Sequence, residues 1–156
     1  MTARDALDGR EHMDAQNAER MQALGAAQWV ALDAGQIVAE LPPALRQIWH
    51  PRVVATTLST HTDMADAARD GLPAGSVLLA EAQTAGRGRA GRRWITPAGS
   101  QVALSLIWRL DSPPPDGLPG LSLVTGLAAV ECLQQMGLNG VALKWPNDVY
   151  WNERKL

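Results

Sequence analysis

The hydrophobic pattern of the chain changes near residue 50. Residues 1–50 carry only short, weak helical stripes, with no spacing typical of a metal or catalytic site and no convincing helix-turn-helix. Residues 51–156 carry longer apolar runs separated by glycine and proline. We therefore predict an N-terminal helical segment over 1–50, which is not a recognisable DNA-binding domain, and a folded body over 51–156.

Two patterns indicate the strands of this body. A continuous apolar run at 77–80 is typical of a strand buried on both faces. Along 102–108 a second strand is indicated by alternation, in which Val102, Leu104, Leu106 and Trp108 alternate with Ala103, Ser105 and Ile107. Shorter apolar runs predict three further strands, at 53–57, 141–145 and 149–151.

Two helices are predicted between these strands. Residues 60–70 form a helical pattern, with Thr60 and Asp63 spaced as a capping box and Gly71 at the end. Residues 121–136 are apolar around most of the helix circumference, so we expect that helix to be largely buried. Together the elements predict an α+β fold with a mixed central β-sheet flanked by helices.

The composition is that of a globular protein, with 46% hydrophobic and 19% charged residues. The chain has one cysteine, which excludes an internal disulfide. It has no run of 18 apolar residues and no visible signal peptide. We therefore expect a cytoplasmic protein without a membrane partner.

Positive charge is concentrated in one short stretch. The net charge is −2, yet residues 86–94 hold four arginines and three glycines and end in Trp94. Glycine lets the backbone approach a ligand closely, arginine forks around carboxylate or phosphate oxygens, and tryptophan offers a face on which a base can stack. Because the charge is local, the stretch predicts a loop that holds a planar anionic ligand, and we expect no nucleic-acid partner.

Two other interpretations of this stretch are disfavoured. Gly86, Gly88 and Gly91 fit the dinucleotide-binding pattern G-x-G-x-x-G, with Asp111 further on, but the residues after Gly91 include Pro97 and leave no room for the helix which that pattern requires. RNA-binding arginine–glycine segments are usually repetitive and disordered, whereas this is a single copy between two apolar runs.

A second motif is the corner Lys144-Trp145-Pro146-Asn147-Asp148. It places a cation and an anion at the two ends of a stiff turn, and Lys155 would reach the same place if the strands around the corner pair. A carboxylate near ligand phosphates suits Mg²⁺, which takes a few carboxylates together with phosphate oxygens. Taken alone, the corner is equally well explained as a plain turn.

The run Glu81–Trp94, the Lys144–Asp148 corner and the final Arg154–Leu156 together resemble the biotin protein ligase family, also called biotin–[acetyl-CoA carboxylase] ligase. The resemblance covers about residues 53–156. It implies the N-terminal part of a catalytic domain related to class II aminoacyl-tRNA synthetases and lipoate ligases, with the C-terminal part missing. It also implies that biotin and ATP, with Mg²⁺, give biotinyl-5′-AMP, and that biotin then moves to a lysine of a carboxylase carrier domain.

The resemblance further implies the site residues. The biotin-binding positions correspond to Ser59, Thr60, Gln83, Arg87 and Arg89. The nucleotide-binding positions correspond to Arg92, Trp94, Lys144, Asn147 and Asp148, with Asp148 beside Mg²⁺. Arg89 and Lys155 correspond to catalytic residues that stabilise charge on the α-phosphate.

The chain departs from the family at one binding position and at its end. His61 stands where the family has asparagine, and histidine cannot present the paired donor and acceptor of an amide. An incomplete domain would leave a sheet edge and an apolar face open, which favours a homodimer through that edge. Two alternative functions remain: a non-catalytic remnant that acts as a biotin- or nucleotide-binding module, and a lipoate-type acyl ligase.

Overall fold

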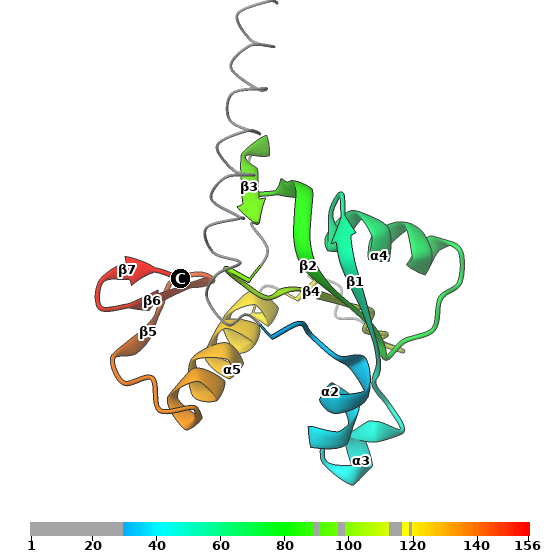
Figure 1. The fold of residues 1–156 in the computed structure, drawn as a ribbon, viewed down its shortest axis with the longest axis horizontal. Coiled ribbons are helices and arrows are strands. Elements are labelled where there is room, and N and C mark those ends of the chain that lie inside the picture. The colour runs from blue at the N-terminus through cyan, green and yellow to red at the C-terminus, as the bar shows by residue number, and fades with distance from the viewer. Residues whose placement is uncertain (1–29, 89–90, 97–98, 113–116, 119) are drawn as a thin grey trace, which may run out of the picture. The chain divides into compact units, whose positions relative to one another are not determined.

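The computed structural model describes residues 30–88, 91–96, 99–112, 117–118 and 120–156 (Figure 1). These residues fall into two compact units, the first ending at Arg109 and the second spanning Leu110–Leu156. The first 29 residues of the predicted N-terminal segment lie outside the described part.

The first unit holds a mixed sheet with helices packed on it. Strand β1 pairs with β2 in parallel, whereas β3 and β4 both pair with β2 antiparallel. Helix α4 packs on β2 and β4, and α2 packs on β1. The predicted α+β fold with a mixed sheet is thus confirmed. In chain order the elements are α2 (Ala34–Glu40), α3 (Pro43–Arg46), β1 (His50–Thr57), α4 (Thr60–Arg69), β2 (Ser76–Arg87), β3 (Arg93–Thr96) and β4 (Ala103–Leu106).

Strand β2 is the core of this unit. Between Val77 and Ala80 its side chains are apolar on both faces: Leu78 and Ala80 on one face are 1% and 0% exposed, and Leu79 on the other face is 5% exposed. The burial predicted for the run at 77–80 is therefore confirmed, and the strand continues well beyond that run, to Arg87. Strand β2 runs on from this buried part to carry Gln83 and Gly86, and its pairing with β3 shifts register between these two residues.

The second unit is a helix packed on a small antiparallel sheet. Helix α5 (Leu121–Gln135) packs on β5 (Val141–Lys144) and β6 (Asp148–Trp151), and β7 (Arg154–Lys155) pairs with β6. Gly126 permits the close approach, because a Cβ there would lie 2.5 Å from Leu143 Cδ1.

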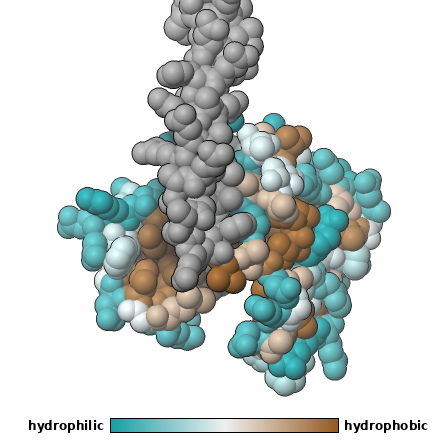
Figure 2. All heavy atoms as spheres, in the orientation of Figure 1, coloured by the Kyte–Doolittle hydropathy of each residue, from teal (hydrophilic) through white to brown (hydrophobic). Residues whose placement is uncertain are grey.

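The prediction that the 121–136 helix is largely buried is wrong. Only Gly126 and Val130 of α5 are buried, while Leu121, Val124 and Leu127 are 54%, 63% and 51% exposed. A helix that packs on one small sheet buries a single stripe, so the rest of its apolar circumference stays at the surface. Figure 2 shows apolar residues reaching the surface of this unit.

None of the helices that the structure describes has the length and apolar content needed to cross a lipid bilayer.

Candidate functional site

The first group of predicted site residues lies at the start of α4. Ser59 is the N-cap of this helix, and its hydroxyl oxygen accepts from the Thr62 backbone N–H at 3.5 Å. The predicted capping box, which began at Thr60, is wrong by one residue. The Asp63 carboxylate instead accepts a hydrogen bond from the Thr57 hydroxyl, at the end of β1.

Thr60 links this helix start to β2. Its backbone N–H donates to Gln83 Oε1 at 2.8 Å, and its hydroxyl donates to the same oxygen at 3.2 Å. The Ser105 hydroxyl of β4 donates to Thr60 Oγ1 at 3.0 Å. The structure therefore brings together Ser59, Thr60 and Gln83, which the sequence indicated from positions more than 20 residues apart.

Burial makes this group suited to recognising a polar ligand. Ser59 and Thr60 are only 3% and 4% exposed, although both carry hydroxyls. Both hydroxyls are already hydrogen-bonded within the chain, and no buried side-chain polar atom of the described residues lacks a partner, so the group is an ordered polar surface. His61, which follows them, is exposed on the first turn of α4.

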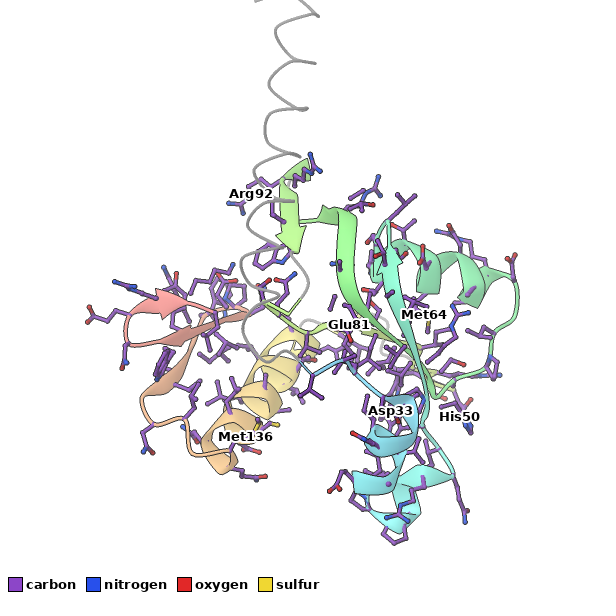
Figure 3. The ribbon with its side chains drawn as sticks, in the orientation of Figure 1. Asp33, His50, Met64, Glu81, Arg92 and Met136 are labelled. Carbon is purple, nitrogen blue, oxygen red and sulfur yellow. The ribbon has the colours of Figure 1, made fainter. Side chains whose placement is uncertain are left out.

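The glycine–arginine stretch forms a hairpin, which corrects the predicted loop. Gly86 and Arg87 still belong to β2, and they pair with Trp94 and Arg93 of β3. The predicted loop is therefore only the tip, where the Gly88 N–H donates to the Arg92 carbonyl at 2.7 Å. Arg92 marks this tip in Figure 3.

The residues of this hairpin that are predicted to bind biotin or the nucleotide lie at its surface. The side chains of Arg87 and Arg92 are exposed. Trp94 is 40% exposed, and its indole N–H donates to Gln101 Oε1 at 3.0 Å, which fixes the edge of the ring. Arg89 lies outside the described residues.

The second group of site residues lies in the second unit, around the predicted corner. Lys144 and Asp148 are cross-strand partners of β5 and β6, and Asn147 is exposed in the turn between them. The Lys155 ammonium of β7 donates to Asp148 Oδ1 at 2.7 Å. The prediction that Lys155 reaches the corner is confirmed, although the strand that carries it was not predicted.

A tight turn delivers Lys155 to this position. Asn152 and Glu153 both have positive φ, 47° and 64°, between the paired residues Trp151 and Arg154. Two consecutive residues with positive φ are typical of the type I′ turn of a two-residue hairpin loop. Asn152 is compatible with this turn, because asparagine tolerates the left-handed region better than most residues, but one asparagine does not by itself predict the strand that follows.

Lys144 is held beside an aromatic ring on the same sheet. Its ammonium lies 5.1 Å from the Tyr150 ring centroid and 3.4 Å from the Tyr150 hydroxyl oxygen. The contact orients a cation at the entry to the corner.

The donor set limits what metal this corner could hold. Among the described residues there is no group of three or more His, Cys, Asp or Glu side chains that could hold a metal ion. Asp148 offers one carboxylate, which Lys155 already contacts. Such a site fits Mg²⁺ only where ligand phosphates supply most of the oxygens.

Sequence reasoning missed Ser105, which contacts Thr60. The alternation along β4 would place Leu104 and Leu106 on the buried face and Ser105 opposite them, yet these leucines are 48% and 44% exposed and Ser105 lies toward α4. Its contact with a residue 45 positions earlier was not readable, because it depends on the pairing of β4 with β2.

Comparisons of the sequence and of the structure with known proteins both find biotin protein ligases. The pattern that defines the biotin/lipoate A/B protein ligase family matches residues 53–156. The bifunctional ligase/repressor BirA of Escherichia coli is 47% identical over 85 residues, which are 54% of this chain and 26% of that protein. The biotin–[acetyl-CoA-carboxylase] ligase of Mycobacterium tuberculosis is 43% identical over 108 residues, which are 67% of this chain and 41% of that protein.

Two solved structures have similar folds. The biotin protein ligase of Aquifex aeolicus in complex with biotin and ATP matches with a TM-score of 0.58 and 30% identity, over 69% of this chain and 44% of that one. The biotin acetyl coenzyme A carboxylase synthetase of Helicobacter pylori with bound biotinylated ATP matches with a TM-score of 0.59 and 28% identity, over 69% and 52%. The chain thus spans about half or less of the length of these relatives.

Proposed function

Because the chain belongs to the biotin/lipoate A/B protein ligase family, we propose that it carries out biotin–protein ligation. In the first step the biotin carboxylate attacks the α-phosphorus of ATP, and pyrophosphate leaves as biotinyl-5′-AMP forms. In the second step a lysine amine of a carboxylase carrier domain attacks the acyl carbon, AMP leaves, and the amine loses a proton. The names of the similar proteins support both the reaction and this partner.

The main structural support for biotin as the substrate is the buried polar cluster at the start of α4. Ser59 and Thr60 are almost fully buried, and Thr60 is hydrogen-bonded to Gln83. The ureido ring of biotin has N–H donors and a carbonyl acceptor, whereas the dithiolane ring of a lipoyl group has neither. The Ser59 hydroxyl oxygen already accepts a bond from the Thr62 N–H, and its own proton can still donate to the ureido carbonyl. A dithiolane ring offers no such acceptor, so the cluster supports biotin over lipoate.

Catalysis in this proposal depends on cations. A carboxylate that attacks a phosphate brings two anions together, and charge builds on the phosphoryl oxygens in the transition state. Arg89 and Lys155 would stabilise that charge, while Arg87 would cover the biotin side of the adenylate. A hairpin tip that folds over the mixed anhydride would also keep water from hydrolysing it.

The nucleotide contacts in this proposal are assigned to the remaining predicted site residues. Adenine would stack on Trp94, whose ring is fixed at its indole N–H. Arg92, Lys144 and Asn147 would contact the phosphates and ribose. Mg²⁺ would enter with the ATP phosphates, and Asp148 would hold it there while Lys155 turns to the α-phosphate.

Location and assembly are part of the same proposal. We place the protein in the cytoplasm, because the reaction needs ATP. We also propose a homodimer through β1, since among the described strands β1 pairs only with β2 and its other edge has no strand partner.

Incubation of the chain with biotin, MgATP and a biotin acceptor domain tests the proposed reaction. We expect biotin-dependent release of pyrophosphate, followed by biotin covalently linked to the acceptor, and no product with lipoate. Biotin binding without pyrophosphate release would support the non-catalytic binding module. Modification with lipoate in place of biotin would support the lipoate-type ligase. A folded chain that binds neither acid would overturn the proposal.

A further inference from the structure

We propose that Ser105 is a positioning residue, which acts through the Thr60 hydroxyl to strengthen the hydrogen bonding that holds the Gln83 amide in place for the acyl substrate. The inference rests on the proposed function for the identity of that substrate, biotin. Ser105 lies on β4, Thr60 on α4 and Gln83 on β2, so the hydrogen-bonded chain joins three elements of the first unit.

The direction of the Gln83 amide follows from the backbone. The Thr60 N–H can only donate, so the Gln83 atom 2.8 Å from it has to be the oxygen Oε1 and not the nitrogen Nε2. A reversed amide would place N–H against N–H at this contact. The backbone of α4 therefore sets one orientation of the amide.

Proton counting then gives Ser105 its role. Each hydroxyl carries one proton, and the Thr60 hydroxyl donates its proton to Gln83 Oε1 at 3.2 Å. The 3.0 Å contact between the two hydroxyls is therefore made by the Ser105 proton, with Thr60 Oγ1 as acceptor. Without the Ser105 hydroxyl, Thr60 loses the bond that holds its own proton toward Gln83.

This arrangement turns the amide nitrogen toward the hairpin. A Cβ at Gly86 would lie 3.3 Å from Gln83 Nε2, so the NH₂ group lies beside the glycine backbone. The donors of Gln83 therefore lie on the side of the predicted anion-holding stretch, and the acceptor lies on the side of α4. We infer that the Ser105–Thr60–Gln83 chain keeps this polarity fixed, so that the site is ordered before biotin binds.

Kinetics of pyrophosphate release test this role in the full chain. Ser105→Ala should raise the KM for biotin about three- to tenfold, the effect of one lost hydrogen bond, and leave the KM for ATP unchanged. Ser105→Thr keeps a hydroxyl and should restore the KM for biotin. The matched control is Ser122→Ala, a half-buried serine of α5 outside the proposed site, which should leave both KM values unchanged.

A double-mutant cycle separates positioning from general structure. In a Thr60→Val background the hydrogen-bonded relay Ser105–Thr60–Gln83 is already broken. Ser105→Ala should then have no further effect on the KM for biotin. An additive effect, or an equal rise in the KM for ATP, would overturn the role of Ser105.

The side-chain amide signals of Gln83 give a readout that needs no ligand. In the ligand-free chain, Ser105→Ala should shift the Gln83 NH₂ resonances and speed their hydrogen exchange, whereas Ser122→Ala should not. Unchanged resonances would overturn the relay. If the wild-type chain binds no biotin, the proposed function fails, but these signals still decide whether the relay exists.

Discussion

At the scale of single residues, Gly86 shows why the hairpin next to the polar cluster tolerates little change. The residue is buried in β2 opposite Trp94. An added Cβ would lie 2.6 Å from the Trp94 carbonyl oxygen, a distance at which the backbone of β3 has to move. The glycine is required by this close approach between two strands, and its φ is not the reason.

Gly86→Ala should therefore destabilise the chain and misplace Trp94. We expect a loss of about 1–3 kcal/mol in the free energy of unfolding, as for other overpacked sites. Gly120→Ala is the matched control, because a Cβ there has nothing within 4 Å and the backbone has φ −83°. Gly120 is the N-cap of α5, where alanine is less favourable than glycine, so we expect this control to cost only about 0.5–1 kcal/mol, without any displacement of a neighbouring strand. Denaturant unfolding measures both, and equal stabilities of the two variants would contradict the close contact.

Substitution of Lys155 can distinguish a catalytic role of this residue from a structural one. Its ion pair with Asp148 has side-chain exposures of 42% and 33%, and such exposed pairs contribute about 1 kcal/mol or less to stability. Lys155→Gln should therefore leave thermal unfolding almost unchanged. It should still slow biotin-dependent pyrophosphate release about a hundredfold, as expected when a group that stabilises transition-state charge is lost.

Arg154→Gln removes the same charge from the neighbouring exposed position of β7 and serves as the control. We expect its rate to stay within about twofold of the wild-type rate, since surface charges away from the reaction change little. If both variants slowed the reaction equally, Lys155 would act only through the general charge of the hairpin.

At the scale of elements, Ser59 has two roles that can be tested separately. It caps α4, and it is a proposed biotin contact. Ser59→Ala should cost about 1 kcal/mol of stability because alanine is a poor N-cap, whereas Ser59→Gly should cost only a few tenths. Both variants lack the hydroxyl, so both should lose biotin affinity to a similar extent. Thermal unfolding and biotin titration of the two variants check this. If the variant that loses more stability also loses more biotin affinity, Ser59 acts only as the N-cap.

The sequence predicted those elements that have their own local signal. The continuous apolar run at 77–80, the capped helical pattern at 60–70 and the long apolar stretch at 121–136 are strong local signals, and all three elements form. Strands β3 and β7 lack such a signal. Arg93–Thr96 is a strand because it pairs with β2, and Arg154–Lys155 because a two-residue turn folds it onto β6. Burial of α5 was overestimated because an apolar circumference does not say how many neighbours a helix has.

At the scale of the whole molecule, the predicted site residues divide between the two units. Motif residues such as Gln83 and Lys155 were identified from sequence, because the runs that contain them resemble those of one family. Their partners could not be identified in the same way. Ser105 meets Thr60 only after β4 pairs with β2, and that pairing is set by the core. The motifs therefore predicted the candidate site residues, whereas the residues that orient them could be identified only from the folded structure.

Assembly is the remaining property of the whole molecule, and it depends on the edge of β1. Two strands that pair by two-fold symmetry run antiparallel, so a two-fold axis near the middle of β1 would bring Ala55 of the two copies close together. Ala55 is exposed on β1, and lysine there would place like charges across the pair. We expect sedimentation to show a wild-type dimer that dissociates on dilution, and a monomer for Ala55→Lys at the same concentrations. Ala68→Lys, an identical change at an exposed position of α4, should remain dimeric. A wild-type monomer at all concentrations, or equal loss of the dimer in both variants, would exclude the β1 edge as the interface.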